Sequence, residues 1–466
     1  MHALKDKNFL RGTIAIALPI AMQNLISFVV QLADTVMLGL APGGETLLSA
    51  SSLANQPFFI LSIACFGFSG AATVLSAQYY GKKDYASVRV IFSIVLKAVI
   101  LVSIVLGLAV LLFPEHVMRL YTDSPAVIER GAEYLRILGY AYFTFGFSNT
   151  LVCCLRSVEI VKISVVVNLA SLVTNVFLNW VLIFGNLGAP ALGIQGAAIA
   201  TLTARLLEFV IICVYVFLID KRLRFRLRDM LSYNGTLAKD ILKYGSPVLI
   251  NEVAWALAIS LQAVILGHIT YSEGDPVAAN SIANTIQQLA TIVIFGIANA
   301  AAVMVGKAIG EGKSHQEVLD LSHTLLWVTI LVGLALAAVA LALVPLLFQP
   351  IVFPLFKLYD QTALIATALA VTGFASIPLH AYSITAVTGV LRAGGDVFCS
   401  AALDISPQWL VALPLTAVIA LVMDASCWWV AAAVQAESLL KCPLCWYRIR
   451  KGRWIHDVTL PEGRDL

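Results

Sequence analysis

The sequence has little charge. Of its 466 residues only 12% are Asp, Glu, Lys or Arg, while 60% are hydrophobic. Soluble globular chains carry about 25% charged residues, so the composition excludes an ordinary soluble domain and indicates an integral membrane protein. The formal net charge of +3 is less informative than the places where the charges lie.

The sequence also lacks the motifs of a membrane-embedded enzyme. It contains no HExxH, no GxSxG and no paired acids at catalytic spacing. The stretch "KAIGEGKS" ends like a phosphate-binding loop, but it begins at Lys307 instead of Gly and no strand precedes it. Cys442 and Cys445 form a single CxxC without a second CxxC or a His pair, which is a weak metal signal. We therefore expect no enzyme activity, no metal site and no cofactor, and the role of the two cysteines stays open.

Long apolar segments fill most of the chain. Most of them exceed the ~20 residues that a helix needs to cross the hydrocarbon, so they should tilt, bend or protrude. The alternation over ~10-residue pieces that a membrane β-barrel would show is absent. We predict twelve transmembrane helices, over residues 13–40, 47–78, 88–113, 127–155, 160–184, 193–219, 238–270, 277–306, 317–348, 361–391, 397–422 and 426–446.

Basic and neutral loops alternate along the chain. The loops "APGGET", "GNLGAPALGIQ", "YSEGDP" and "MDAS" are acidic or neutral. Basic loops stay in the cytoplasm, so both termini should lie on the cytoplasmic side of a bacterial inner or plasma membrane. The basic groups comprise Lys5, Lys7 and Arg11; Lys82, Lys83 and Arg89; the loop after the sixth span with Lys221, Arg222, Arg224, Arg226, Arg228, Lys239 and Lys243; and a tail with Lys441, Arg448, Arg450, Lys451 and Arg453.

The two halves of the chain repeat each other. "LPIAMQNLISFVVQLADTVMLG" aligns with "SPVLINEVAWALAISLQAVILG", which pairs Pro19 with Pro247, and "CLRSVE" aligns with "VLRAGG", which pairs Arg156 with Arg392. Each half holds six spans, so both halves enter the membrane from the same side. We predict an all-α membrane protein with two six-helix bundles related by a pseudo-twofold axis along the membrane normal. The predicted parts are residues 1–220, a basic cytoplasmic linker at 221–237, and residues 238–466.

The chain resembles the MATE (multidrug and toxic compound extrusion) family, close to members from Gram-positive bacteria. The resemblance covers residues 14 to about 454, nearly the whole chain. Its motifs are moderately specific singly and highly specific in this order. They are "LADTVMLG", "SLANQPFFI", "AQYYGKKD", "LRSVEIVK", "NVFLNWVLIFGNLGAPALGIQGAAIATLTAR", "YGSPVLINEVAW", "SIANTIQQL", "GIANAAAVMVGKAIG" and "GVLRAGGD".

This resemblance implies a secondary antiporter that works by alternating access. It would export organic cations or amphipathic compounds in exchange for H⁺ or Na⁺, as a monomer among membrane lipids, with no nucleic-acid partner. Na⁺-coupled members usually carry an Asp in the tenth span and this chain has none, which weakens a Na⁺ assignment and leaves the ion open. Two alternatives remain: a flippase of lipid-linked saccharides or cell-wall precursors from the same superfamily, and an ion channel or intramembrane enzyme.

Asp34 is the only charged residue after Arg11 in the first span. A carboxylate inside a span costs roughly 2.5–3.5 kcal/mol on insertion scales, so it should face the bundle interior or a wet cavity. The resemblance links this Asp to ion or proton coupling, in the company of Asn175, Asn179 and Thr201; the alternative is a structural acid among helix-packing polar groups. Some family members have Asp at the position of Asn179, so this chain lacks the second acid of a two-acid relay.

Glu252 is the acid of the seventh span, and its repeat mate is Asn24, whereas the mate of Asp34 is Gln262. We expect coupling in one bundle and contact with substrate or ion in the other, with Asp404 as a further candidate; structural roles are the alternative. Glu208 is predicted to form a structural ion pair with Arg205.

The remaining candidates are a lone histidine, four amides and two prolines. His380 is expected to be a packing residue. The four amides are expected either to join helices or to line the cleft: Gln56, Asn284, Gln287 and Gln288. Pro19 and Pro247 each remove a backbone hydrogen bond, which predicts a hinge in each of their helices.

Overall fold

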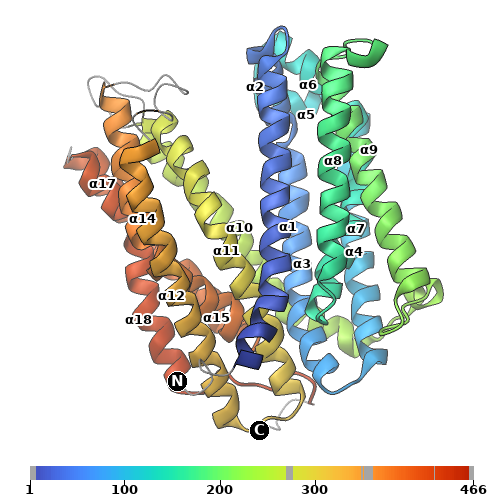
Figure 1. Ribbon diagram of the computed structural model, residues 1–466, viewed down its shortest axis with the longest axis vertical. Helices are drawn as coiled ribbons and strands as arrows, with labels where there is room; N and C mark the ends of the chain where they lie inside the picture. The colour runs from blue at the N-terminus through green and yellow to red at the C-terminus, as the bar shows by residue number, and fades with distance from the viewer. Residues whose placement is uncertain (1–6, 269–275, 348–349, 351–359, 424–425, 461–466) are drawn as a thin grey trace. The chain divides into compact units, whose positions relative to one another are not determined.

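A computed structural model describes residues 7–268, 276–347, 350, 360–423 and 426–460. Helices account for nearly all regular structure in this part of the chain, and its only β pairing is an isolated bridge between Gly395 and Ile455. Figure 1 shows the helices, which in the first half are α1 (Lys7–Leu40), α2 (Gly44–Ala54), α3 (Gln56–Gly81), α4 (Tyr85–Leu112), α5 (Pro114–Arg119), α6 (Pro125–Leu138), α7 (Ala141–Ser157), α8 (Lys162–Phe184) and α9 (Ile194–Val214).

The described part of the second half of the chain is also helical. Its last helices are interrupted by π-helical turns at η6 (Thr385–Leu391), η7 (Gln408–Ala412) and η8 (Val418–Val422). The helices are α10 (Gly235–Gly267), α11 (Pro276–Gly310), α12 (His315–Leu347), α14 (Asp360–Ile384), α15 (Val397–Pro407), α16 (Leu413–Ala417), α17 (Cys427–Val434) and α18 (Ala436–Arg450).

Ten helical segments of the described chain are long and apolar enough to cross a membrane, or eleven if α6 and α7, bent by 56°, form one span. The segment predicted as the twelfth span corresponds to α17 and α18, which meet at Gln435. It falls outside this set because each helix is short and α18 carries Glu437 and Lys441. Both charges have partners inside the protein, as described below.

The chain forms two compact units. Unit 1 comprises residues 1–21 and 250–466, and unit 2 comprises residues 22–249. The chain passes between the units inside α1 and again inside α10, and each passage comes just after a proline, Pro19 in α1 and Pro247 in α10. The predicted bundle boundaries near residues 220 and 238 stay a prediction.

Unit 2 packs its helices around a core of Leu, Ile, Val and Ala with two buried tyrosines, Tyr134 and Tyr142. The helices α8 and α9 lie side by side. A Cβ atom on Gly196 of α9 would lie 2.6 Å from the carbonyl oxygen of Leu182 in α8. Only glycine allows this backbone approach, and it brings the polar faces of α8 and α9 together.

The described part of unit 1 has apolar clusters around Phe374, around Trp454 and around Leu266. Trp454 belongs to the segment after α18 and is fully buried. A Cβ atom on Gly394 would lie 2.2 Å from Cε3 of Trp454, and the neighbouring Gly395 pairs with Ile455. Arg448 fastens the same region, because its Nε lies 2.7 Å from a carboxylate oxygen of Asp396. Residues 451–460 are therefore part of the fold of unit 1.

The backbone supports the repeat predicted from the sequence. Glu159 and Gly395, which the alignment of "CLRSVE" with "VLRAGG" pairs, both have a left-handed backbone, with φ of 64° and 88°. Both close the turn that follows the paired arginines Arg156 and Arg392. A non-glycine residue in this conformation is uncommon, so the shared geometry indicates that the two halves fold alike at this turn.

Candidate functional site: two polar clusters inside helical units

The first cluster surrounds Asp34 in unit 2. Asp34 lies in α1 and is half-buried. The Nδ2 amide of Asn179 donates a hydrogen bond to its carboxylate. Asn179 also donates to Oδ1 of Asn175 at 3.2 Å, and Asn175 donates to Oγ1 of Thr201 at 3.3 Å. The structure thus brings together all four residues predicted for the coupling site, which we call the Asp34 cluster.

The positions of these side chains follow from their helices. Asn175 and Asn179 are one helical turn apart on α8, so they share a face, and both are buried. Thr201 reaches Asn175 because Gly196 lets α9 approach α8 closely. Two side-chain hydrogen bonds join α1 to α8, one from Asn179 to Asp34 and one from Ser27 to Asn168.

Two further side chains, Tyr134 of α6 and Arg205 of α9, take part in the Asp34 cluster. The buried Tyr134 interacts with Thr201 and Asn55, and Asp34 interacts electrostatically with Arg205. The predicted ion pair is confirmed, since Arg205 contacts both carboxylate oxygens of Glu208 at 2.9 Å. No motif in the sequence points to Tyr134, whereas an arginine inside an apolar span is itself a signal of function.

The second cluster lies in unit 1 around Asp404. Lys441 of α18 is 5% exposed, and its Nζ lies 2.8 Å from Oδ1 of Asp404 and 3.4 Å from Oε2 of Glu437. Asn251 of α10 donates to Oδ2 of Asp404 at 2.9 Å. The expectation that Lys441 belongs to a basic tail is therefore wrong, because its ammonium group is buried between two acids.

Glu252 lies beside this second cluster. Nη1 of Arg392 is 3.4 Å from Oε1 of Glu252 and donates a hydrogen bond to it, and Arg392 also interacts electrostatically with Asp404. The Arg392 side chain is 9% exposed and that of Glu252 is 28% exposed. Glu252 therefore has a buried cationic partner, while part of its own side chain stays exposed. We call Asn251, Glu252, Arg392, Asp404, Glu437 and Lys441 the Asp404 cluster.

The two clusters have a similar composition. In unit 2, Arg205 of α9 pairs with Glu208 and interacts electrostatically with Asp34. In unit 1, Lys441 of α18 pairs with Asp404 and Glu437. The acids differ in position, as the sequence indicated, so the clusters share a plan while their chemistry differs.

The other predicted residues have separate surroundings. Gln56 is the exposed first residue of α3, and Asn284 and Gln288 are exposed on α11. Gln287 packs on Gly373 of α14, since its Nε2 occupies the place where a Cβ on Gly373 would stand. His380 interacts electrostatically with Glu437, Lys441 and Asp404, so it borders the Asp404 cluster. Cys442 and Cys445 are free thiols, and Cys442 donates to the Leu379 carbonyl at 3.3 Å.

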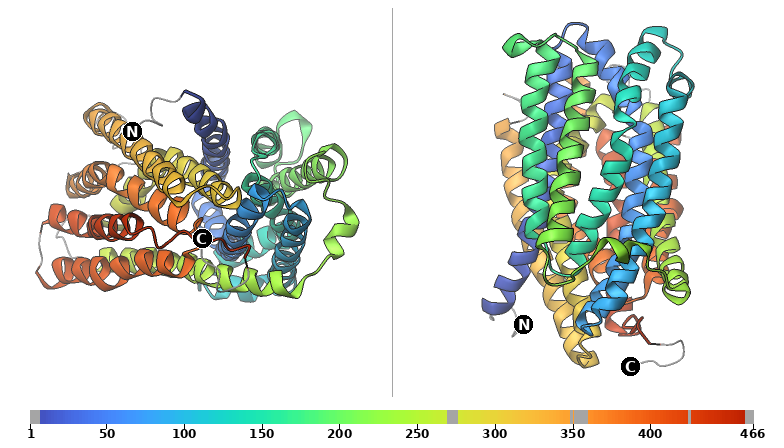
Figure 2. Two further views of the ribbon diagram at one scale, coloured as in Figure 1. Left: turned by 90° about the horizontal axis from the view of Figure 1, so that it is seen from below. Right: turned by 90° about the vertical axis from the view of Figure 1, so that its right-hand side faces the viewer.

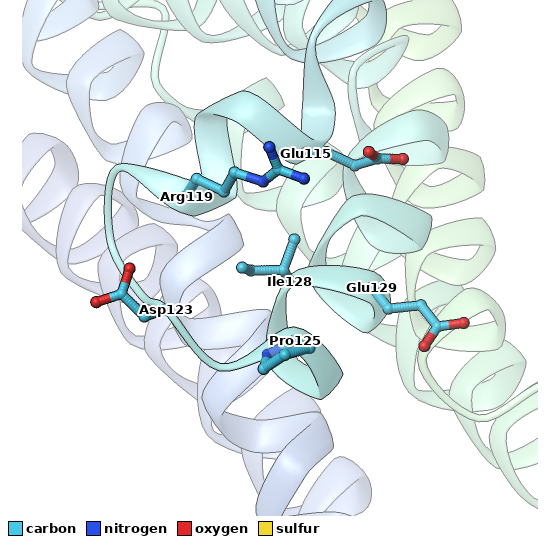
Figure 3. A pocket seen from close by; sticks show the side chains of 6 residues that line it. All are labelled: Glu115, Arg119, Asp123, Pro125, Ile128 and Glu129. Carbon is cyan, nitrogen blue, oxygen red and sulfur yellow. The ribbon is translucent and has the colours of Figure 1, made fainter.

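A surface pocket of about 430 Å³ lies on α5 and α6 of unit 2. Figure 3 shows the charged side chains that line it, Glu115, Arg119, Asp123 and Glu129, together with Pro125 and Ile128. The pocket shares no residue with the Asp34 cluster and contains none of the predicted site residues. We therefore place the candidate chemistry in the two clusters.

Charged side chains buried among several long apolar helices are typical of a multi-pass integral membrane protein. The chain belongs to the MatE family, whose model matches residues 19–181 and 247–418. This confirms the family resemblance seen in the sequence.

Known proteins of this family resemble the chain over much of its length. It is 30% identical to the probable multidrug resistance protein NorM of Rhizobium meliloti (strain 1021), over 65% of this chain and 64% of that relative. It is 24% identical to the probable multidrug resistance protein YoeA of Bacillus subtilis (strain 168), over 86% of this chain and 85% of YoeA. A solved structure of a multidrug resistance MATE transporter of the MOP superfamily in an outward-facing conformation superposes with a TM-score of 0.81. The superposition covers 95% of this chain and 96% of the solved chain, and the two sequences are 19% identical. This similarity confirms the fold.

Proposed function

We propose that the protein is a secondary multidrug efflux antiporter that exports organic cations or amphipathic compounds in exchange for H⁺ or Na⁺. The observation that carries the proposal is Asp34, a carboxylate held by the Asn179 amide inside an apolar helix. The repeat puts Gln262 at the matching position, so the fold does not require an acid there. The names of the relatives supply the substrate class.

The Asp34 cluster has the chemistry to hold a proton or a small cation. Besides the carboxylate it offers the Thr201 hydroxyl and the Oδ1 atom of Asn179, which is buried and accepts no hydrogen bond from the described residues. Carboxylate, amide and hydroxyl oxygens are ligands for hard cations. The carboxylate alone can take up a proton. Either event removes negative charge from the middle of the cluster.

Alternating access requires the ion and the substrate to bind the inward-facing and outward-facing states with different affinities. A ligand shifts a conformational equilibrium only if it binds the two states unequally. In the proposed cycle a substrate enters from the cytoplasm, and the ion or proton at Asp34 favours the state that releases substrate outside. Glu252, Asp404, Gln56, Asn284, Gln287 and Gln288 are proposed to contact substrate or ion, while Pro19 and Pro247 are proposed as hinges. The termini are proposed to lie in the cytoplasm, and the protein to act as a monomer.

The pairing of charged side chains inside the two units argues against the flippase alternative. A site for a lipid-linked pyrophosphate needs cations that are free to bind phosphate. Three cations inside the two units are paired with acids, Arg205 with Glu208, Arg392 with Glu252, and Lys441 with Asp404. The buried Arg156 is the exception among these interior cations, since it donates to Sγ of Cys153. This pairing favours a cationic or amphipathic substrate over an anionic one.

The test is drug efflux from cells that carry Asp34→Asn. Asparagine keeps the size of the side chain and removes the charge, so the variant should insert normally but lose efflux and resistance. Asp123→Asn is the matched control, since Asp123 is an exposed acid of the same unit at the surface pocket, and it should keep wild-type efflux. Wild-type resistance in Asp34→Asn cells would refute the proposal.

A further inference from the structure

The segment between α9 and α10 forms a distinct structure on unit 2. It comprises residues 220–233, which we call the basic strap, and it follows the span Ile194–Ile219 and precedes the span Gly235–Leu266. Its middle is the short 3₁₀ helix η4 (Leu227–Leu231). The strap is the yellow-green segment at the right-hand edge of the left-hand view in Figure 2.

Apolar side chains fasten the strap to α4. Leu223 and Phe225 are 1% and 2% exposed. The ring of Phe225 lies 6.3 Å from that of Phe92 in α4 and 6.1 Å from that of Phe217. These contacts fix the inner side of the strap.

Hydrogen bonds from α4 hold the backbone of the strap. Arg89 donates to the Leu223 carbonyl at 2.9 Å, and Ser93 donates to the Met230 carbonyl at 2.8 Å. Lys97 donates to the Ser232 carbonyl at 2.7 Å. The polar residues on this part of α4 therefore anchor the strap.

Two acids fix the strap from within. The Asp220 carboxylate accepts hydrogen bonds from the backbone N–H groups of residues 222, 223 and 224, and the Asp229 carboxylate accepts one from the N–H of Arg226. The backbone of Arg224 is left-handed, with φ of 53°. Because the acids bind backbone groups, they leave the guanidinium groups of the strap available.

The outer side of the strap is basic. Arg222, Arg224, Arg226 and Arg228 are all exposed, and the buried Leu223 and Phe225 alternate with the first three of them. In the described part of the chain, the side chains of Arg224, Arg226 and Arg228 form no ion pair. Four guanidinium groups thus lie on one preorganised surface, which lowers the entropic cost of binding.

Large apolar side chains border these arginines. Leu218 is 78% exposed, Leu227 is 68% exposed, Leu231 is 83% exposed and Tyr233 is 70% exposed. Such a mixture of cations and apolar side chains is typical of segments that lie in the membrane interface. Both ends of the strap continue into membrane spans, which holds the whole segment close to the lipid headgroups.

We propose that the basic strap binds anionic phospholipid through its headgroup phosphate. The guanidinium group matches a phosphate bidentately, and the exposed leucines and Tyr233 would contact the adjoining hydrocarbon. Soluble phosphate offers no apolar part for these side chains, and the nearness of two membrane spans favours lipid over a soluble partner. Lipid binding by unit 2 at the strap therefore depends on the content of anionic lipid in the membrane face on which the strap lies.

The test is lipid retention by the intact, detergent-solubilised protein, measured by native mass spectrometry with phosphatidylglycerol and phosphatidylcholine. The wild type should retain phosphatidylglycerol in preference to phosphatidylcholine. The variant R222Q/R224Q/R226Q/R228Q should lose that preference by about tenfold or more, since each basic residue near an anionic surface contributes to binding. The charge-matched control K313Q/R450Q/K451Q/R453Q removes four exposed cations of unit 1 and should keep it.

A salt series on the wild type gives an answer even if the strap variant does not fold. Phosphatidylglycerol retention should fall between 0.1 and 1 M salt, where the Debye length shrinks from about 10 Å to about 3 Å. Inorganic phosphate at the same concentration should not displace the lipid. Unchanged preference in the strap variant, an equal loss in the control, salt-independent retention or displacement by inorganic phosphate would each overturn the proposal.

Discussion

Within unit 1, Nζ of the buried Lys441 lies 2.8 Å from Oδ1 of Asp404 and joins α18 to α15. The same ammonium group contacts Glu437 one turn earlier on its own helix. A buried cation with two acids is stable only while its partners remain, because an unpaired charge would keep the full cost of leaving water. This relationship makes the last helix dependent on the Asp404 cluster.

Lys441→Met should therefore destabilise the protein strongly. Methionine keeps the length of the side chain, but Asp404 and Glu437 lose their shared counter-ion. Removing one partner of a buried pair costs about 3–5 kcal/mol, and the 24% exposure of the Asp404 side chain puts the expected loss near the lower end. The measurement is thermal unfolding of the purified protein in detergent.

A double-mutant cycle compares Lys441→Met and Asp404→Asn with the double variant Lys441→Met/Asp404→Asn. It removes the uncompensated charge on Asp404, so it should recover part of the stability lost in Lys441→Met. Additive losses from the two substitutions would show that the residues do not interact energetically.

Trp454→Ala should destabilise unit 1 although the residue lies beyond the last helix. Its indole is fully buried against Gly394, and removing a buried tryptophan costs about 3–5 kcal/mol. Trp429→Ala is the control, since Trp429 is 65% exposed and should change the unfolding temperature little. Equal effects of the two substitutions in a thermal unfolding assay would contradict the packing role of the terminal segment.

Asn179→Ala should lower efflux by about tenfold or more, because a lost hydrogen bond to a charged group is worth roughly 1.5–3 kcal/mol. It removes the amide that donates to Asp34. The control is Asn186→Ala, which removes an exposed amide bonded to the Trp180 carbonyl in the same unit. Efflux is measured in cells at matched protein levels. Equal efflux from Asn179→Ala and the control would place Asn179 outside the working site.

Glu252→Gln tests whether Glu252 serves transport or only structure. The single variant leaves Arg392 without its 3.4 Å partner, so both stability and efflux should fall. Adding Arg392→Gln removes the unpaired cation and should restore much of the unfolding temperature while efflux stays low. Recovery of efflux together with stability in the double variant would mean that Glu252 only neutralises Arg392.

The sequence predicts those features that depend on local spacing. Apolar run length indicates the spans, and the one-turn spacing of Asn175 and Asn179 places both on one helix face. The predicted residues of the Asp34 cluster do meet, because α1, α8 and α9 each bring a polar face to the same place. Motifs distributed over the whole chain identify the family even at low identity.

Features that depend on tertiary contacts could not be predicted in this way. Tyr134 enters the Asp34 cluster from α6, which shares no repeat or motif with Asp34. Lys441 resembles a tail residue in sequence because it stands near other cations, and only the fold shows its two acid partners. The basic composition of residues 221–237 does not indicate that any of their side chains are buried, and only the fold shows the burial of Leu223 and Phe225.

The proposed antiport through Asp34 is tested by transport in proteoliposomes of purified protein under an imposed Na⁺ or pH gradient, one gradient at a time. We expect one of the two gradients to drive uphill movement of a cationic dye by the wild type, and we expect Asp34→Asn to move the dye under neither gradient. Dye movement by Asp34→Asn at the wild-type rate, or gradient-independent conductance by the wild type, would contradict a coupled antiport through Asp34.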